Sequence, residues 1–240
     1  MKKILLLGLF ISVVFSASIF AQAAKGSGKV KIETLEFSGF KHLILNGTFN
    51  VILLQGDEEG IRISTDDNLV NLFQVRMDKE KLYITMLADV RKFEELNVYI
   101  SYRELKSITL LKNVSISSNQ VIHFDELKLF LSGGSTINSE IYATVLHIKQ
   151  NDQSFCKISG YAEKLYIDIH DETEFNCFSL KSEFCQVEAT GYSEVMINCE
   201  KSLKLKVTGE SNVYYTGEPK ITERIFSSNG FIVKRKSADN

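Results

Sequence analysis

Residues 127–135 read LKLFLSGGS, and the pattern of this stretch recurs along the chain. It is an alternating apolar run that ends in a short polar turn. Comparable runs begin at spacings of 19, 19, 20 and 18 residues, at Leu127, Leu146, Leu165, Cys185 and Leu203. A near-constant period of this length is typical of a solenoid, in which each turn buries its apolar face on its neighbours. We expect an all-β solenoid with about 19 residues per turn.

The alternation predicts which side chains face the interior of the coil. The position two residues after each start is apolar in every repeat: Leu129, Ile148, Ile167, Val187 and Leu205. The position between the starting residue and this third residue is mostly polar: Lys128, His147, Tyr166, Gln186 and Lys204. Because successive side chains of a strand point to opposite faces, the starting and third positions should face inward and the second outward. After the turn, a further inward column should hold Ile137, Cys156, Phe175, Val195 and Val213.

Short strands separated by turn residues are predicted for the N-terminal half. Alternating apolar residues mark the stretches 49–53, 61–63, 82–86 and 98–102, and only 68–75 suggests a helical turn. No linker rich in Pro, Gly or Ser divides the two halves. We therefore expect one continuous domain over 37–236, with N-terminal strands at 37–107 and repeats at 108–240. The N-terminal strands should form a layer that caps one end, and Ile221 to Lys236 should cap the other, because open ends expose strand edges.

The first residues have the pattern of a signal peptide. Lys2 and Lys3 precede an apolar run, and Ala21-Gln22-Ala23 is a small-x-small cleavage site. We expect a signal peptide at 1–23, a polar leader at 24–36, and a chain that does not span a membrane after cleavage. The mature protein should reach the periplasm, the outer-membrane surface or the extracellular space. The net charge of −2 favours no nucleic-acid partner.

Several stretches resemble one known family. Residues 47–57 read GTFNVILLQGD, followed by Leu82-Tyr83-Ile84, by Val98-Tyr99-Ile100 and by YYTGEP at 214–219. In these stretches the chain resembles the putative auto-transporter adhesin, head GIN domain family. The resemblance implies an exported bacterial all-β protein that folds as a right-handed, single-stranded β-helix, and it supplies no catalytic residues. Cys185 stands where the family usually has an aliphatic residue.

The four cysteines all have inward parity. Cys156, Cys177, Cys185 and Cys199 do not stack on one another in one column. Buried free thiols are one interpretation, and a diagonal disulfide from Cys177 to Cys156 or Cys199 is the other. The chain has no Cys-x-x-Cys pair and no histidines at ligand spacing, so we predict neither a metal site nor a cofactor.

Two groups of residues are candidates for ligand binding. The outward aromatics Phe130 and Tyr166, with Tyr192 and Tyr214 as candidates to lie beside them, could form a strip that stacks on sugar rings or on a protein. At the turns, Asp152, Asp171 and Glu172 on adjacent repeats could bind a cation or a sugar. The Ser and Thr residues of the same turns (Ser135, Ser154, Thr173, Ser193 and Ser211) should instead satisfy the backbone of their own turn.

Three functions are compatible with these features. The first is an exported, non-enzymatic, adhesin-like module that presents a flat β face to a glycan or a surface protein. The second is a carbohydrate-active β-helix enzyme that uses carboxylates of adjacent turns. The third is a structural envelope protein that self-associates through a strand edge into a homo-oligomer.

Overall fold

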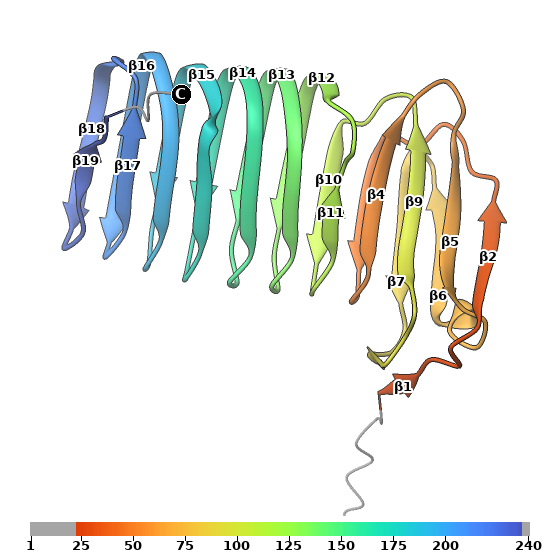
Figure 1. The fold of residues 1–240 in the computed structure, drawn as a ribbon. Helices are drawn as coiled ribbons and strands as arrows, with labels where there is room; N and C mark the ends of the chain where they lie inside the picture. Colours follow the sequence, from red (N-terminus) through yellow and green to blue (C-terminus); the bar gives the residue numbers. More distant parts are fainter. Residues whose placement is uncertain (1–22, 237–240) are drawn as a thin grey trace, which may run out of the picture.

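The computed structural model describes residues 23–236, with the side chain of residue 228 left out. The predicted signal peptide therefore lies outside the described residues except for Ala23. The described chain is a β-solenoid of about seven turns, about 19 residues apart, as the repeats predict (Figure 1). Its only helical element is the 3₁₀ turn Val70–Leu72, within the stretch for which a helical turn is predicted. None of the described residues forms a helix long and apolar enough to cross a membrane.

Five long strands form the repeats. They are β12 (Ile122–Leu131), β13 (Thr136–Gln150), β14 (Phe155–Ile169), β15 (Glu174–Ala189) and β16 (Glu194–Gly209). Each pairs in parallel with the next. β13 to β16 bend near their middles and contribute to both long sides of the coil, whereas the shorter β12 pairs only with 141–150 of β13. We call the side built by the ends of the five strands (127–131, 146–150, 165–169, 185–189 and 203–207) the first wall. The second wall holds the beginnings of β13 to β16.

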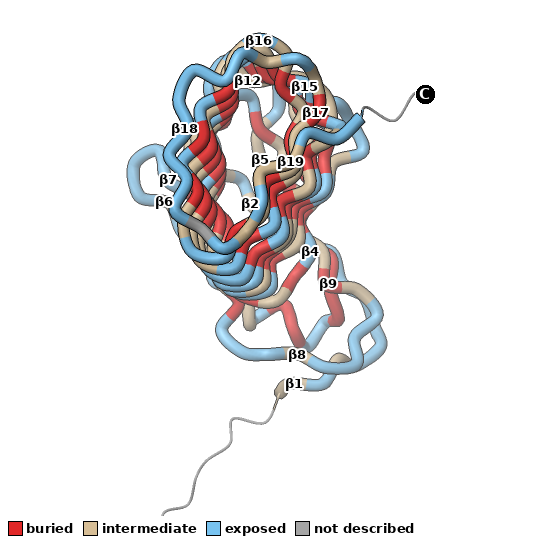
Figure 2. The backbone as a smooth tube through the Cα atoms, turned by 90° about the vertical axis from the view of Figure 1, so that its left-hand side faces the viewer, coloured by how far each residue is buried: buried red, intermediate tan, exposed pale blue. Residues whose placement is uncertain are grey.

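The predicted inward columns are confirmed. Leu127 lies opposite Leu146, Leu146 opposite Leu165, and Leu165 opposite Cys185. The residues of the starting and third positions are at most 3% exposed, and Phe175 and Val195 are fully buried. Seen along the axis, buried residues line the inside of both walls behind the last turn (Figure 2). The repeated side chains therefore form one continuous hydrophobic core.

The solenoid begins earlier in the chain than the repeat pattern indicates. The first wall continues through β10 (Ser107–Leu111), β3 (His42–Asn46) and β7 (Lys81–Met86), all parallel. The second wall continues through β11 (Ser115–Ser117), β4 (Asn50–Gln55) and β9 (Leu96–Tyr102). These strands lack the 19-residue spacing because β5 to β7 intervene between β4 and β9. Period alone could not find them.

Antiparallel strands form the outer layer of the N-terminal end. β6 (Phe73–Asp78) pairs with β7, β5 (Gly60–Asp66) pairs with β9, and β2 (Val30–Leu35) pairs with β5. β1 (Ala24–Lys25) pairs with β8 (Val90–Arg91) beside them. The stretch 24–36, expected to be a polar leader, thus contributes two strands to the fold.

The C-terminal segment continues the coil. β17 (Asn212–Thr216) pairs with β16 in the second wall, β18 (Lys220–Ser228) pairs with β16 in the first, and β19 (Ile232–Lys234) pairs with β17. All three pairings are parallel. The segment expected to cap this end instead forms one more turn, with an outer edge of its own.

All four cysteines are free and buried in the core, the first of the two interpretations offered by the sequence. Their register partners are not cysteines, and the Cys185 thiol lies 2.8 Å from Ser182 Oγ. Burial raises the pKa of the Cys156 thiol well above its usual range. The thiols fill the core as small apolar groups.

Candidate binding site

The outward columns of the first wall bring separate repeats side by side. One column holds Lys128, His147, Tyr166 and Gln186, and the next holds Thr109, Phe130, Lys149 and Asp168. Both columns face solvent because their neighbours along each strand face the core. Residues about 19 positions apart in sequence are therefore direct neighbours on this surface.

A groove of about 460 Å³ lies on these columns, and we call it the aromatic groove. Phe130 and Tyr166 both line it, so the structure brings the two predicted aromatics to one site. The ring of His147 stacks on Tyr166, with 4.6 Å between centroids and 10° between planes. Tyr192 is 64% exposed at a corner, and Tyr214 lies on β17 in the second wall against Arg235. These two tyrosines do not line the groove.

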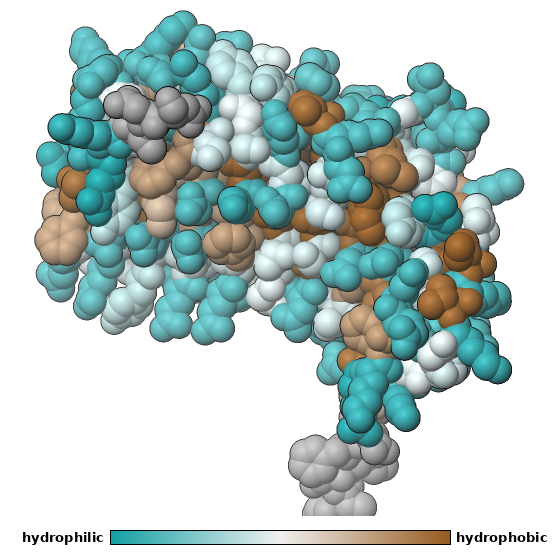
Figure 3. Space-filling model, in the orientation of Figure 1, coloured by the Kyte–Doolittle hydropathy of each residue, from teal (hydrophilic) through white to brown (hydrophobic). Residues whose placement is uncertain are grey.

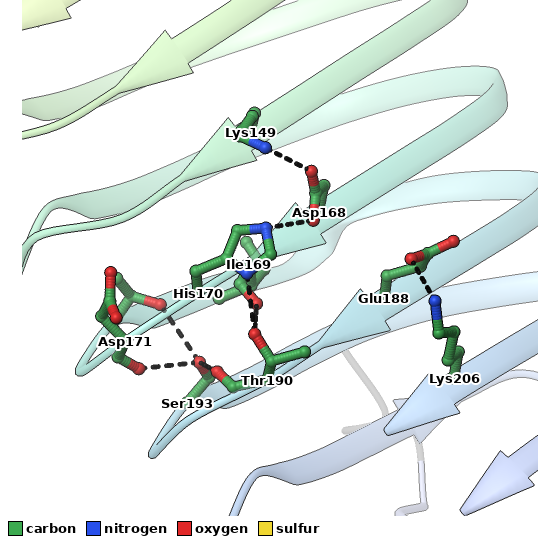
Figure 4. A network of polar contacts seen from close by, with 10 residues as sticks. Lys149, Asp168, Ile169, His170, Asp171, Glu188, Thr190, Ser193 and Lys206 are labelled. Carbon is green, nitrogen blue, oxygen red and sulfur yellow. Dashed lines mark hydrogen bonds and ion pairs between the residues drawn. The ribbon is translucent and has the colours of Figure 1, made fainter. Parts of the chain in front are cut away.

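Charged side chains border the aromatic groove on the next turns. Lys149 Nζ lies 2.8 Å from Asp168 Oδ2, and His170 Nε2 lies 2.7 Å from Asp168 Oδ1. His170 Nδ1 is in turn 2.7 Å from Thr190 Oγ1, while Glu188 pairs with Lys206 (Figure 4). The rim therefore offers hydrogen-bond donors and acceptors in fixed positions beside the aromatic rings.

A larger depression of about 850 Å³, the junction pocket, lies where the N-terminal strands meet the repeats. It is lined by the column His123, Tyr142 and Tyr161 and by the connection at 103–107. His123 and Tyr142 repeat the pairing seen at His147 and Tyr166, with ring centroids 5.6 Å apart. The Gln55 side chain holds the start of β12, since its amide bonds the carbonyl and the N–H of His123 at 3.0 and 3.1 Å.

The two depressions adjoin each other, since Ser107 and Lys128 line both of them. We call the combined surface the outer cleft. Figure 3 looks onto the second wall, on the opposite side of the solenoid from the aromatic groove. Aromatic rings line the outer cleft and charged pairs border it. An apolar floor with a polar rim is the usual character of a ligand-binding surface.

The predicted carboxylates also come together, in a shallow depression of about 490 Å³ at the corner after the first wall. Asp152, Asp171 and Glu172 line it, and all three are exposed. The Asp152 carboxylate accepts a 2.5 Å hydrogen bond from Ser132 Oγ, and Glu172 accepts one of 3.3 Å from Gln153 Nε2. Within residues 23–236 no three acidic, His or Cys side chains are grouped to hold a metal ion.

The hydroxyl column of the same corner behaves as predicted. Ser193 Oγ donates to the carbonyls of Asp171 and Thr190, each at 3.0 Å (Figure 4). Ser154 Oγ donates to the Asn151 carbonyl at 2.7 Å. These buried hydroxyls satisfy the backbone of their own and neighbouring turns, so they are structural.

The sequence interpretation missed the histidines and two tyrosines of the outer cleft. His123 and His147 looked scattered because neither stands at a metal-ligand or triad spacing. A signal was present, since Tyr142 and Tyr161 are one 19-residue period apart and His147 precedes Tyr166 by the same interval. Residues of the same outward column should have been compared as neighbours.

The protein is thus a β-solenoid with an aromatic groove on one wall. Residues 39–219 match the family described as putative auto-transporter adhesin, head GIN domain. This match covers most of the chain, and the protein belongs to that family.

Solved structures share the fold. A putative adhesin from Bacteroides fragilis is 18% identical, with a TM-score of 0.79 over 89% of this chain and 99% of that one. A putative adhesin from Parabacteroides distasonis is also 18% identical, with a TM-score of 0.72 over 89% and 100%. A structure from the same organism described as a putative lipid binding protein is 12% identical, with a TM-score of 0.72 over 90% and 99%. No match was found among curated proteins.

Proposed function

We propose that this protein is an exported, non-enzymatic binding module that holds a glycan along the outer cleft. The observation that carries the proposal is the aromatic groove, where Tyr166 stacked on His147 and the nearby Phe130 line one depression. Pyranose rings have an apolar face that packs on aromatic side chains, and their hydroxyls need fixed hydrogen-bond partners. Asp168 and Lys149 supply such partners at the rim.

The length of the outer cleft favours an extended chain of several sugars over a single sugar. The aromatic groove lies on the first wall and the junction pocket beside it, and together they extend from the N-terminal strands to β15. Neighbouring turns are about 4.8 Å apart, so side chains of one column meet an extended polymer at regular intervals. A rigid solenoid loses little conformational entropy on binding, because its surface is already in the bound arrangement.

The direct test is binding of the purified protein to a panel of soluble polysaccharides, followed by calorimetry on any that bind. Tyr166→Ala combined with Phe130→Ala should weaken binding at least tenfold, about 1.4 kcal/mol. Tyr192→Ala is the matched control, because Tyr192 is more exposed but lies outside the groove. Binding that survives the double substitution would refute the proposal.

The enzymatic alternative places the reaction at the acidic corner. A catalytic general acid usually lies in an apolar pocket, whereas Asp152, Asp171 and Glu172 are open to water. The same polysaccharide panel should therefore show no new reducing ends. Turnover that Asp152→Asn or Asp171→Asn abolishes would replace the binding proposal with an enzymatic one.

A surface location is the remaining part of the proposal. Protease treatment of intact cells, compared with a known periplasmic protein, should remove this chain selectively. Survival of the chain until the outer membrane is broken would exclude adhesion and direct attention to periplasmic glycans.

A further inference from the structure

The C-terminal end of the solenoid ends in two strands with free outer edges. β18 pairs with β16 and β19 with β17, and no strand among residues 23–236 pairs with the other side of either. β18 is nine residues long and contains no proline. A register shift leaves Thr222 without a partner in β16, so the regular part of this edge runs over 223–228. A regular edge without proline can pair with the edge of another chain, and its charges restrict which partner and register are compatible.

Apolar side chains of the core columns are uncovered at this end. Ile221 lies opposite Leu203 and Phe226 opposite Val207, while Arg224 lies opposite Leu205 between them. Leu203 and Val207 are fully buried, whereas Ile221 and Phe226 are 38% and 39% exposed because no turn stacks on them. Phe231, in the connection to β19, is 62% exposed. Figure 2 looks onto this end and shows the exposed last turn in front of the buried walls.

The partner must cover both walls at once. β18 belongs to the first wall and β19 to the second, with the uncovered apolar residues between them. A single peptide strand could cover one edge only. The C-terminal end of a second copy has the same two edges at the same separation. The N-terminal end differs, since its outer strands β2 and β6 come from an antiparallel layer.

We propose that two copies of this chain associate head to head through their C-terminal ends, about a two-fold axis. The axis makes β18 of one copy antiparallel to β18 of the other, and likewise β19, so both edges and the apolar mouth are buried together. The proposal concerns the end of the solenoid and is independent of glycan binding on its wall.

The charges of β18 select the register. In a two-fold antiparallel pair, one residue of β18 faces its own counterpart. Glu223 or Arg224 at that position would set like charges opposite each other, which is destabilising. Ile225, which is 48% exposed, instead gives an apolar pair. With Ile225 at the axis, Arg224 lies opposite Phe226 of the second copy. Within its own chain, Arg224 Cζ already lies 5.6 Å from the centroid of the Phe226 ring.

Sedimentation equilibrium of the purified protein tests the association. We expect a monomer–dimer equilibrium that Ile225→Lys, which sets two lysines at the axis, weakens at least tenfold. Ile32→Lys on β2 is the control, since Ile32 is 59% exposed at the opposite end and should leave the equilibrium unchanged. Ile225 points outward and is half exposed, so matched thermal unfolding should show both variants folded.

A crosslink tests the register. Ile225→Cys should give a covalent dimer with a short bismaleimide, because the native thiols are buried and the new ones meet at the axis. A protein that stays monomeric at all concentrations would overturn the proposal. A dimer that Ile32→Lys dissociates, or that Ile225→Lys leaves intact, would overturn it as well.

Discussion

The inward and outward columns of the first wall lie on the same strands and differ in how uniform they are. The starting column holds Leu, Leu, Leu, Cys and Leu, all buried, while the neighbouring outward column holds Lys, His, Tyr, Gln and Lys. Each inward side chain is enclosed by the turns above and below, so its size and polarity are fixed by them. Outward side chains have no such restriction. Columns in which one residue type recurs therefore form the scaffold. Columns in which the residue type changes from turn to turn form the surface where binding can be specific.

The largest expected effect comes from breaking an inward column. Phe175 is fully buried between Cys156 and Val195, so Phe175→Ala should leave a cavity and cost about 3–5 kcal/mol of unfolding free energy. Phe130→Ala removes the same ring from the outward side and should cost less than about 1 kcal/mol. Urea unfolding measures both. Equal losses would contradict the distinction between the columns.

At the corner after the first wall, buried hydroxyls and exposed carboxylates should differ in how much they contribute to stability. Ser193→Ala removes the two hydrogen bonds of Ser193 Oγ and leaves buried carbonyls with fewer partners, at a cost of about 1–3 kcal/mol. Asp171→Asn and Glu172→Gln alter exposed groups and should stay within about 0.5 kcal/mol of the native protein. A corner stabilised by its carboxylates would show the reverse order in thermal or urea unfolding.

One buried polar group interrupts the core, and its removal should be tolerated. Tyr102 is fully buried, and its hydroxyl has no hydrogen-bond partner among the described residues. Tyr102→Phe should therefore be neutral or stabilise the protein by up to about 1 kcal/mol. Burial also raises the pKa of Tyr102, so in an alkaline absorbance titration its phenol should stay protonated while exposed tyrosines ionise. A clear loss of stability in Tyr102→Phe would reveal a partner for this hydroxyl.

The smallest expected effect is the pH dependence contributed by His147. Partial burial lowers its pKa, with Glu126 raising it and Lys128 lowering it to smaller extents. The unfolded chain therefore binds a proton more readily than the folded one. The contribution of His147 to stability is complete above the ordinary value of about 6.5 and decreases as the pH falls toward the lowered value.

Comparison with His147→Gln isolates this contribution. Between pH 7.5 and pH 5, urea unfolding should show the native protein losing slightly more stability than the variant. A native protein that gains stability relative to the variant on acidification would mean that the pairing with Glu126 dominates.

The sequence predicted those parts of the fold in which the same contact recurs on every turn. The columns of Leu127 and Ile137, the corner serines and the buried thiols all follow from a 19-residue period combined with strand alternation. The turns formed by β3 with β4 and β7 with β9 could not be found this way, because their neighbours in space are distant in the chain. The same reason hid part of the candidate site. Phe130 and Tyr166 stood out as outward aromatics, whereas the junction pocket depends on Gln55 and the connection at 103–107, which no repeat brings together.

The most direct test of the central claim is calorimetry on a polysaccharide that binds the native protein. It compares the native protein, the double variant Tyr166→Ala/Phe130→Ala and the control variant Tyr192→Ala. Binding weakened at least tenfold by the double substitution and unchanged by the control would place the glycan in the aromatic groove. Equal binding by all three proteins would show that the outer cleft is not the site.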